Sequence, residues 1–171
     1  ALTEAAKDNK NLILVYFSDY LDKQLGSAQE VWINNSFLEI TKKYDEIYGL
    51  NIQCYDGDPI QYLENLHKNF GISEIYINEV FDPRTKKKDD KIKKHFTDQI
   101  IFKTYNSHLL FSPEEIKNNA GSYFKVYTPF WRNCLSKLII RKPLRPPKEI
   151  NVFQDKRLKG IHDLSLNHSL W

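Results

Sequence analysis

The sequence predicts a single α/β domain built around a mainly parallel sheet. Short apolar runs alternate along the chain with amphipathic stretches of helical period, and the connections between them are short. Strands joined through helices in this way lie parallel and cross over in the right-handed sense. At 171 residues the chain is long enough to bury one core of its own.

The chain opens with a helical stretch and then a buried strand. Residues 1–7 have helical composition but begin without a capping residue. Residues 12–17 form a continuous apolar run, which is typical of a strand that helices cover on both faces. Ser18 and Asp19 follow at the carboxyl end of this strand, where open parallel sheets bind their ligands.

A long amphipathic helix is predicted between Ser27 and Gly49. Ser27 and Glu30 have the spacing of a capping box, and Gly49 suits the left-handed position that ends a helix. The apolar residues recur near the helical period and predict one buried stripe, made of Val31, Trp32, Phe37, Ile40, Tyr44, Ile47 and Tyr48.

A second strand and a second helix follow. Residues 51–55 have the composition of a strand. Asp58 is a cap, Pro59 takes the first helical position, and Gly71 ends the helix. The buried stripe of this helix consists of Leu63, Leu66 and Phe70.

The strand around which the chain is organised is predicted over residues 74–77. It ends at Asn78, and Glu79 and Asp82 lie just beyond it, before Pro83. At the end of a parallel strand such carboxylates can accept hydrogen bonds from a ligand, but they can equally cap the helix that follows. The sequence leaves both interpretations open.

A strongly basic run follows, with seven basic and two acidic side chains in residues 84–94. It is either a patch that faces phosphates or the solvated face of a helix. We favour the solvated face, because no aromatic residue is interleaved for stacking on bases. Residues 99–105 are predicted to form a further strand, and Ser112 and Pro113 to start a short helix.

The composition and the absence of certain motifs argue against several classes of function. A net charge of +3 is too small to indicate a nucleic-acid-binding protein by itself. Cys54 and Cys134 lack the spacing of a metal site and are expected to be buried thiols. The sequence has no phosphate-binding glycine loop, no nucleophile motif and no apolar run long enough for a membrane span. We therefore expect a cytoplasmic protein, and not a self-contained enzyme.

A specific motif is present at residues 121–131, GSYFKVYTPFW. These residues resemble the YKVFTPFW signature of the DNA photolyase/cryptochrome family. Further landmarks follow in the order of the family, at residues 26–28, 57–59, 78–83, 88–89 and 108–110. The resemblance covers nearly the whole chain, because residues 145–148 and 161–166 resemble the linker to the helical domain of that family.

This resemblance implies a doubly wound, Rossmann-like sheet with strand order 3-2-1-4-5. It implies an α/β domain over residues 1–140 and an interdomain linker over residues 141–171. The first strand of the family is absent, so we expect the strands at 12–17 and 74–77 either to face a gap with unpaired edges or to pair directly with each other. Unpaired apolar strand edges favour aggregation, and the isolated chain is therefore expected to be marginally stable.

In this family the α/β domain can hold an antenna pigment, either a folate or a deazaflavin. The resemblance places such a pigment at the carboxyl ends of the strands, in a crevice lined by Phe17, Ser18, Asp19, Gln29, Asn78 and Asp82. Two departures weaken this expectation. Gln29 and Val80 stand where deazaflavin-binding members have an arginine and an acid, and Arg84 and Thr85 replace the asparagine and glutamate of folate-binding members.

Three alternative functions stay open, of which the first two follow from the resemblance. The first is the α/β part of a photolyase, which repairs cyclobutane pyrimidine dimers in DNA under light. The catalytic FAD and the contact with damaged DNA would then belong to a helical domain, in the same chain or a separate one. The second is a fragment of a cryptochrome photoreceptor. The third is a decayed remnant or a stand-alone nucleotide-binding module without photochemistry.

Overall fold

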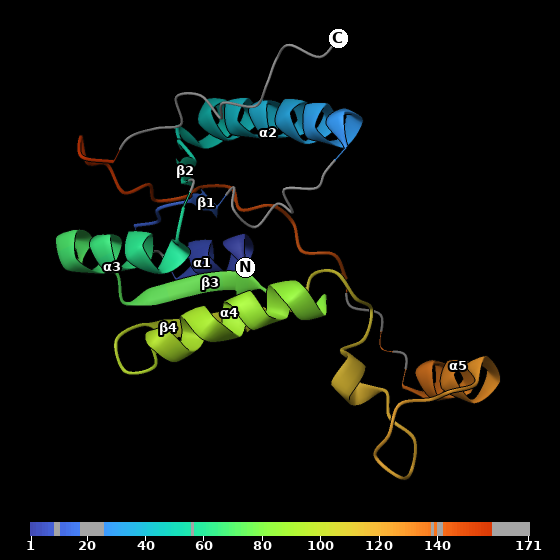
Figure 1. Cartoon of the computed structure of the whole chain (residues 1–171). Coiled ribbons are helices and arrows are strands. Elements are labelled where there is room, and N and C mark those ends of the chain that lie inside the picture. The colour runs from blue at the N-terminus through green and yellow to red at the C-terminus, as the bar shows by residue number, and fades with distance from the viewer. Residues whose placement is uncertain (9–10, 18–25, 56, 138, 140–141, 159–171) are drawn as a thin grey trace.

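The computed structural model describes all residues except 9–10, 18–25, 56, 138, 140–141 and 159–171 (Figure 1). Helices and strands alternate along most of the chain, as the sequence predicts. In chain order the elements are α1 (Leu2–Lys7), β1 (Val15–Phe17), α2 (Ser27–Tyr48), β2 (Gln53–Tyr55), α3 (Pro59–Phe70), β3 (Glu74–Asn78), α4 (Pro83–His95), β4 (Ile101–Tyr105), the 3-10 turn η2 (Pro113–Glu115) and α5 (Tyr127–Ser136).

The strands pair in parallel, which confirms the predicted sheet type. β1 pairs with β2, with Tyr16 opposite Cys54, and β3 pairs with β4, with Tyr76 opposite Lys103. β1 is shorter than predicted, because Leu12 does not pair with β2. It forms a parallel bridge with Val152 in the carboxyl-terminal segment instead.

The four strands form two separate sheets, of order β1-β2 and β3-β4. Among the described residues no strand lies between β1 and β3. This agrees with the first of the two expected arrangements, a gap at the place of the family's first strand. The order β2-β1-gap-β3-β4 is therefore that of a Rossmann-like sheet without its central strand.

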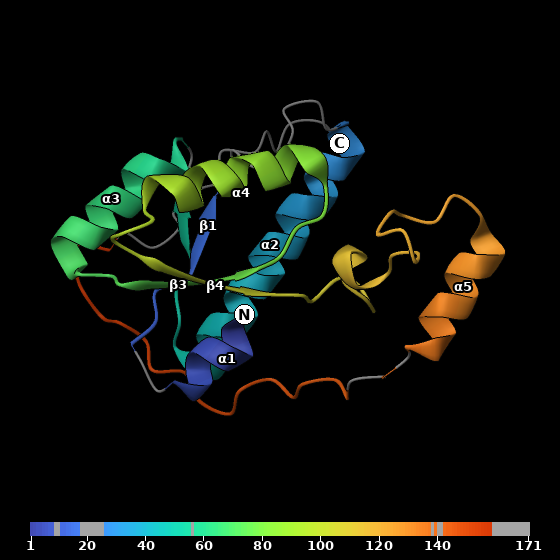
Figure 2. The same cartoon turned by 90° about the horizontal axis from the view of Figure 1, so that it is seen from below.

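Alternate residues of the first apolar run face two different cores. One core surrounds Phe37, Leu50, Ile52 and Ile150, and Leu12, Leu14 and Tyr16 pack against it. The other surrounds Leu63, Leu66, Phe96 and Ile100, and Ile13, Val15 and Phe17 pack against that one. Because side chains alternate along a strand, a continuous apolar run is what a layer between two cores requires. Figure 2 shows the corresponding layers, with α1 and α4 on opposite sides of β3 and β4.

Helix α3 agrees with its prediction at both ends. The Asp58 carboxylate accepts a hydrogen bond from the Ile60 amide at 3.0 Å, and Pro59 occupies the first turn. Gly71 ends the helix with φ of 65°, a left-handed conformation that residues with a β carbon rarely adopt.

Helix α2 starts one residue before the predicted cap. Its N-cap is Gly26 and not Ser27, and the Gln29 side chain accepts a hydrogen bond from the Gly26 amide at 3.3 Å. The predicted pairing of Ser27 with Glu30 was therefore wrong, because Gln29 and not Glu30 stands at the third helical position. Gly49 ends the helix in the left-handed conformation, as predicted.

The prediction that the apolar residues of α2 form one buried stripe was also wrong. Phe37, Tyr44 and Tyr48 do pack in the first core. Trp32, Ile40 and Ile47, however, are 70%, 46% and 65% exposed. At 100° per residue these three positions lie roughly 90° around the helix from the buried ones. The apolar residues of α2 thus belong to two faces, of which only one meets the core.

The segment after β4 leaves the two-core body. η2 and α5 lie to one side of it in both ribbon views (Figures 1 and 2). The chain then returns, because Ile150 is buried in the first core and Leu158 packs against the second. Cys134 in α5 is buried and Cys54 in β2 is half-buried, and within the described residues neither forms a disulfide. In the described part of the chain no helix is long and apolar enough to cross a membrane.

Candidate functional site

A cavity of approximately 790 Å³ separates the two sheets. Its walls include all three residues of β1 and all five residues of β3, and α3 contributes Leu63 and Leu66. Most of the lining side chains are aliphatic or aromatic. The cavity thus occupies the gap between β1 and β3, and we call it the inter-sheet slot.

Two of the six residues expected to line a pigment crevice border the slot. Phe17 lies at the carboxyl end of β1, where its ring packs edge-on against Tyr62 with a centroid distance of 5.8 Å. Asn78 ends β3, and its side-chain oxygen accepts a hydrogen bond from the Ala1 amino group at 3.0 Å. This contact places the start of α1 beside the carboxyl end of β3.

Two others act at helix starts. Asp82 is the N-cap of α4, and its carboxylate accepts hydrogen bonds from the Thr85 amide at 2.9 Å and hydroxyl at 3.0 Å. These bonds lower the pKa of Asp82. Gln29 holds the Gly26 amide at the start of α2. Ser18 and Asp19 lie outside the described residues, so the six-residue pigment crevice stays a prediction.

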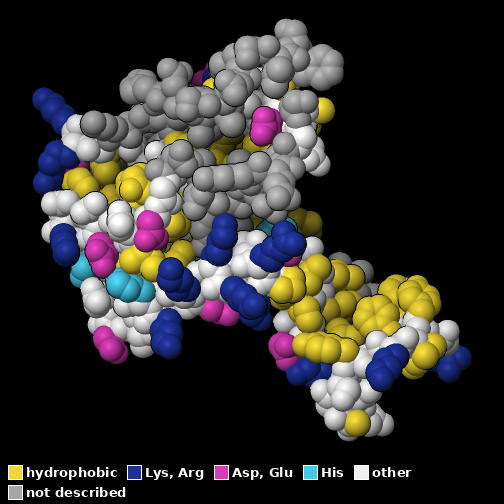
Figure 3. All heavy atoms as spheres, viewed as in Figure 1, with side chains coloured by type: hydrophobic (Ala, Val, Ile, Leu, Met, Phe, Trp, Pro, Cys, Tyr) yellow, Lys and Arg dark blue, Asp and Glu magenta, His cyan; other side chains and the backbone are white. Residues whose placement is uncertain are grey.

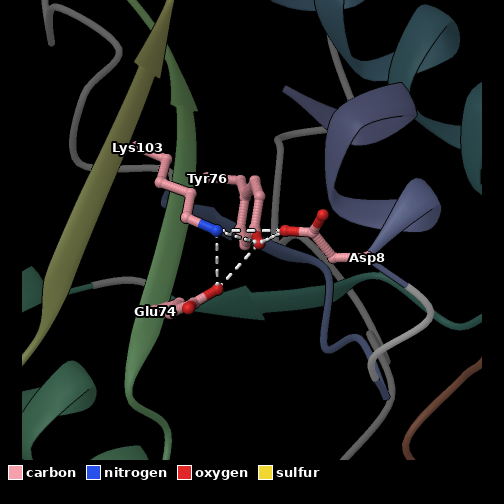
Figure 4. Close-up of polar contacts among 4 residues, drawn as sticks. All are labelled: Asp8, Glu74, Tyr76 and Lys103. Carbon is pink, nitrogen blue, oxygen red and sulfur yellow. Dashed lines mark hydrogen bonds and ion pairs between the residues drawn. The ribbon is translucent and has the colours of Figure 1, made fainter.

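A polar cluster that the sequence did not indicate joins α1 to the second sheet (Figure 4). The Lys103 amino group lies 2.8 Å from the Tyr76 hydroxyl, 3.0 Å from Asp8 and 3.1 Å from Glu74. The Tyr76 hydroxyl also donates to Glu74 at 2.7 Å and contacts Asp8. Glu74 and Tyr76 share one face of β3, but only the strand register brings Lys103 opposite Tyr76.

The protonation states of the cluster suit a stabilising contact and not a catalytic role. Burial and the hydrogen bond with Asp8 raise the pKa of Tyr76 to about 12. The hydrogen bonds with Tyr76 and the two carboxylates raise the pKa of Lys103. At neutral pH the tyrosine is therefore neutral and the lysine charged, so neither is poised to accept a proton. In the described part of the chain no three His, Cys, Asp or Glu side chains gather as metal ligands.

A second unusual surface lies over α5. Six apolar side chains there are 38% to 70% exposed, and we call them the α5 apolar face: Tyr123, Val126, Tyr127, Phe130, Trp131 and Leu135. The rings of Tyr127 and Trp131 stack with an interplanar angle of 6°. Figure 3 shows hydrophobic side chains, in yellow, gathered on the part of the molecule that carries η2 and α5. A contiguous apolar surface of this kind is typical of a protein–protein or interdomain contact.

Comparison with known proteins gives a consistent result. The family model described as DNA photolyase matches residues 1–149. A deoxyribodipyrimidine photo-lyase of Agrobacterium fabrum is 26% identical over 151 residues, which are 88% of this chain and 31% of that protein. Cryptochrome-1 of Arabidopsis thaliana is 29% identical over 81% of this chain and 22% of its own length. The chain thus spans a third or less of these curated relatives.

Solved structures agree in fold. A bacterial class III photolyase from Agrobacterium tumefaciens superposes with a TM-score of 0.82 and 26% identity, over 96% of this chain and 34% of that one. An archaeal photolyase from Sulfolobus tokodaii, described with two FAD molecules, gives a TM-score of 0.73 over 93% of this chain. Its identity is 21%, so this second likeness concerns the fold alone.

Proposed function

The chain belongs to the DNA photolyase family, and from this premise we propose that it is the amino-terminal α/β domain of a light-dependent DNA repair enzyme. Its relatives named deoxyribodipyrimidine photo-lyase support a role in the repair of pyrimidine dimers. In this proposal residues 1–140 form the domain and residues 141–171 lead to a helical domain, although Ile150 and Leu158 of this linker pack against the two cores of the domain. The protein would act in the cytoplasm, as the sequence predicts.

The observation that carries this proposal is the α5 apolar face. Five of its six residues lie within the signature segment at 121–131, and it is exposed on a part of the chain that extends beyond both cores. Leaving large aromatic side chains in water forgoes about 1.5–3 kcal/mol for each one that a partner could bury. An adjoining helical domain is the partner that the family membership indicates.

The α/β domain and its partner would divide the work. FAD, when bound in the helical domain, supplies the photoinduced electron transfer that splits the dimer. The residues of this chain orient that domain through the α5 apolar face and support it with two packed cores. The Tyr76–Lys103 cluster holds α1 against β3 and β4, and takes no part in the chemistry.

The pigment crevice stays a proposal, because Ser18 and Asp19 lie outside the described residues. Of its described residues, Gln29 and Asp82 accept hydrogen bonds at helix starts, whereas Phe17 and Asn78 border the slot at the carboxyl ends of β1 and β3. A folate or deazaflavin antenna would lie beside these residues, and the proposed repair function does not depend on it.

We infer that the inter-sheet slot takes one further parallel strand. β1 and β3 are both parallel to their partners, and the slot between them is lined by apolar residues such as Val15, Ile75 and Ile77. Asn78 contacts Ala1, so a strand ending beside Asn78 would lead directly into α1. From α1 the chain continues to β1, which completes a right-handed strand–helix–strand crossover.

The test is photoreactivation in ultraviolet-irradiated, photolyase-deficient cells. The chain is produced alone and together with the carboxyl-terminal part of the Agrobacterium fabrum relative as a separate polypeptide. We expect light-dependent survival only when both are present. Survival with this chain alone would contradict the proposal.

A matched pair of variants tests the interface. Tyr127→Ser with Trp131→Ser removes two rings of the α5 apolar face and should reduce the recovery at least tenfold. Trp32→Ser with Ile47→Ser removes two apolar side chains on α2 that are 70% and 65% exposed, and should leave the recovery unchanged. Equal losses in both variants would show that the α5 apolar face is not the contact.

The second candidate is a cryptochrome photoreceptor, favoured by the 29% identity to Cryptochrome-1 of Arabidopsis thaliana. It predicts association with the helical domain through the same face, but no repair. Association without light-dependent survival would therefore favour the photoreceptor, whereas a stand-alone nucleotide-binding module would show neither.

A further inference from the structure

The net positive charge of helix α4 is larger than that of the whole chain. Its 13 residues include seven Lys or Arg and two Asp side chains, a net charge of +5. The net charge of the chain is +3, so the other 158 residues together carry −2. Positive charge is therefore concentrated on one element of an otherwise slightly acidic molecule, where it creates a local positive potential.

The helix has two distinct faces. Its inner face borders the inter-sheet slot with Thr85, Asp89 and Ile92. Turned roughly 200° from these positions lie three exposed lysines, which we call the lysine ridge: Lys87, Lys91 and Lys94. Figure 3 shows Lys and Arg side chains gathered on the surface over α4. The ridge thus faces solvent, while Thr85, Asp89 and Ile92 face the body of the molecule.

The spacing of the ridge suits a row of phosphates. Steps of four and three residues keep the lysines on one face, and the rise of 1.5 Å per residue spreads them over about 10 Å. One strand of duplex DNA presents a phosphate roughly every 3.4 Å along the axis, so about three phosphates face a ridge of this length.

We propose that the lysine ridge is an accessory DNA-binding surface that contacts the phosphate backbone, independently of base sequence and of damage. The choice of DNA as the polyanion rests on the proposed repair function. Backbone contact follows from the composition of the ridge, which has no aromatic or amide side chain to stack on bases or read their edges. An anionic membrane is less suitable, because the ridge carries no apolar side chain to insert and Ile92 lies on the inner face.

The experiment measures binding of the full chain to an undamaged, fluorescein-labelled duplex in the dark, by fluorescence anisotropy at several salt concentrations. The triple variant Lys87→Gln, Lys91→Gln, Lys94→Gln should bind at least tenfold more weakly at low salt. The slope of log K against log salt should become shallower by about 2.7, which is 0.9 for each of three phosphate contacts.

The matched control removes the same charge elsewhere. Lys42→Gln, Lys43→Gln and Lys68→Gln replace three exposed lysines on α2 and α3 and should leave the slope unchanged. Circular dichroism of both variants verifies the fold. Equal weakening in the control, no binding by the parent chain, or tighter binding to phosphatidylserine vesicles than to DNA would each overturn the proposal.

This assay separates the ridge from the repair function, because it needs neither light nor FAD nor the helical domain. Loss of binding in the ridge variant supports the ridge even if photoreactivation fails, in which case only the proposed function falls. Unchanged binding in the ridge variant overturns the ridge even if photoreactivation succeeds.

Discussion

Asp58 and Asp82 show how a residue's neighbours decide its role. Each aspartate precedes a proline, and its carboxylate accepts a hydrogen bond from a backbone amide in the first turn of the helix that follows. The sequence predicted a helix cap at Asp58. For Asp82 it left two roles open, a helix cap or a group that binds a ligand. Proline at the first helical position needs no hydrogen-bond partner, so an Asp–Pro pair at a strand end favours the capping role.

The cap of α3 offers a direct test. Asp58→Ala removes the acceptor for the Ile60 amide and should lower the free energy of unfolding by about 1 kcal/mol. Asp58→Asn keeps a side-chain oxygen in place and should retain most of the stability. Urea denaturation followed by circular dichroism measures both. Equal stability of the alanine variant and the parent would show that this bond contributes nothing.

The Tyr76–Lys103 cluster predicts a loss of stability in alkaline solution. The folded chain raises the pKa of Tyr76 from 10.0 to about 12 and raises that of Lys103 above 10.5. Because both folded pKa values exceed the unfolded ones, the contribution is complete below about pH 10 and disappears as the pH rises through the folded values. We expect the melting temperature to fall between pH 10 and pH 12, measured by thermal circular dichroism.

The double variant Tyr76→Phe, Lys103→Met lacks both titrating groups and should show a smaller fall over this range. Tyr127→Phe, at an exposed ring of α5, is the control and should follow the parent chain. Parallel curves for the parent and the double variant would mean that the cluster does not couple stability to pH.

At the scale of the element, α2 shows what periodicity misses. Its apolar residues satisfy the helical period, but they divide between a face in the first core and a face in solvent. Hydrophobicity indicates which residues can be buried, and the neighbours in space decide which ones are.

Two substitutions on α2 should therefore differ strongly. Phe37 is 8% exposed and packs on Tyr16 with a centroid distance of 4.5 Å. Phe37→Ala should cost about 3–5 kcal/mol of unfolding free energy, the usual cost of emptying an aromatic core position. Trp32→Ala, at 70% exposure, should change it by no more than about 0.5 kcal/mol. Urea denaturation decides, and a similar cost for both would restore the single buried stripe.

At the scale of the molecule, the divided sheet governs stability. Two two-stranded sheets face each other across the slot, and neither is large enough for independent stability. We expect the isolated chain to be marginally stable and to melt over a broad temperature range when followed by circular dichroism. A sharp and reversible transition would contradict this expectation.

A separate peptide that occupies the inter-sheet slot as a strand should stabilise the chain. A peptide with the first-strand sequence of the Agrobacterium fabrum relative should raise and sharpen the melting transition in a saturable way, since it binds only the folded state. The same peptide with a central proline lacks a backbone donor and should have no effect. Equal effects of the two peptides would show that the slot does not accept a strand.

The sequence by itself determined the alternation of elements, the parallel pairing and the family. Those features depend on local signals, such as the Asp58–Pro59 cap, Gly71 and the apolar run at residues 12–17, or on a contiguous signature around Trp131. Only the tertiary structure decided the Asp8–Tyr76–Lys103 cluster, the two faces of α2, the return of Ile150 to the core and the position of the lysine ridge. These depend on strand register and on which surfaces meet, and residues far apart in the chain carry no local signal of their contact.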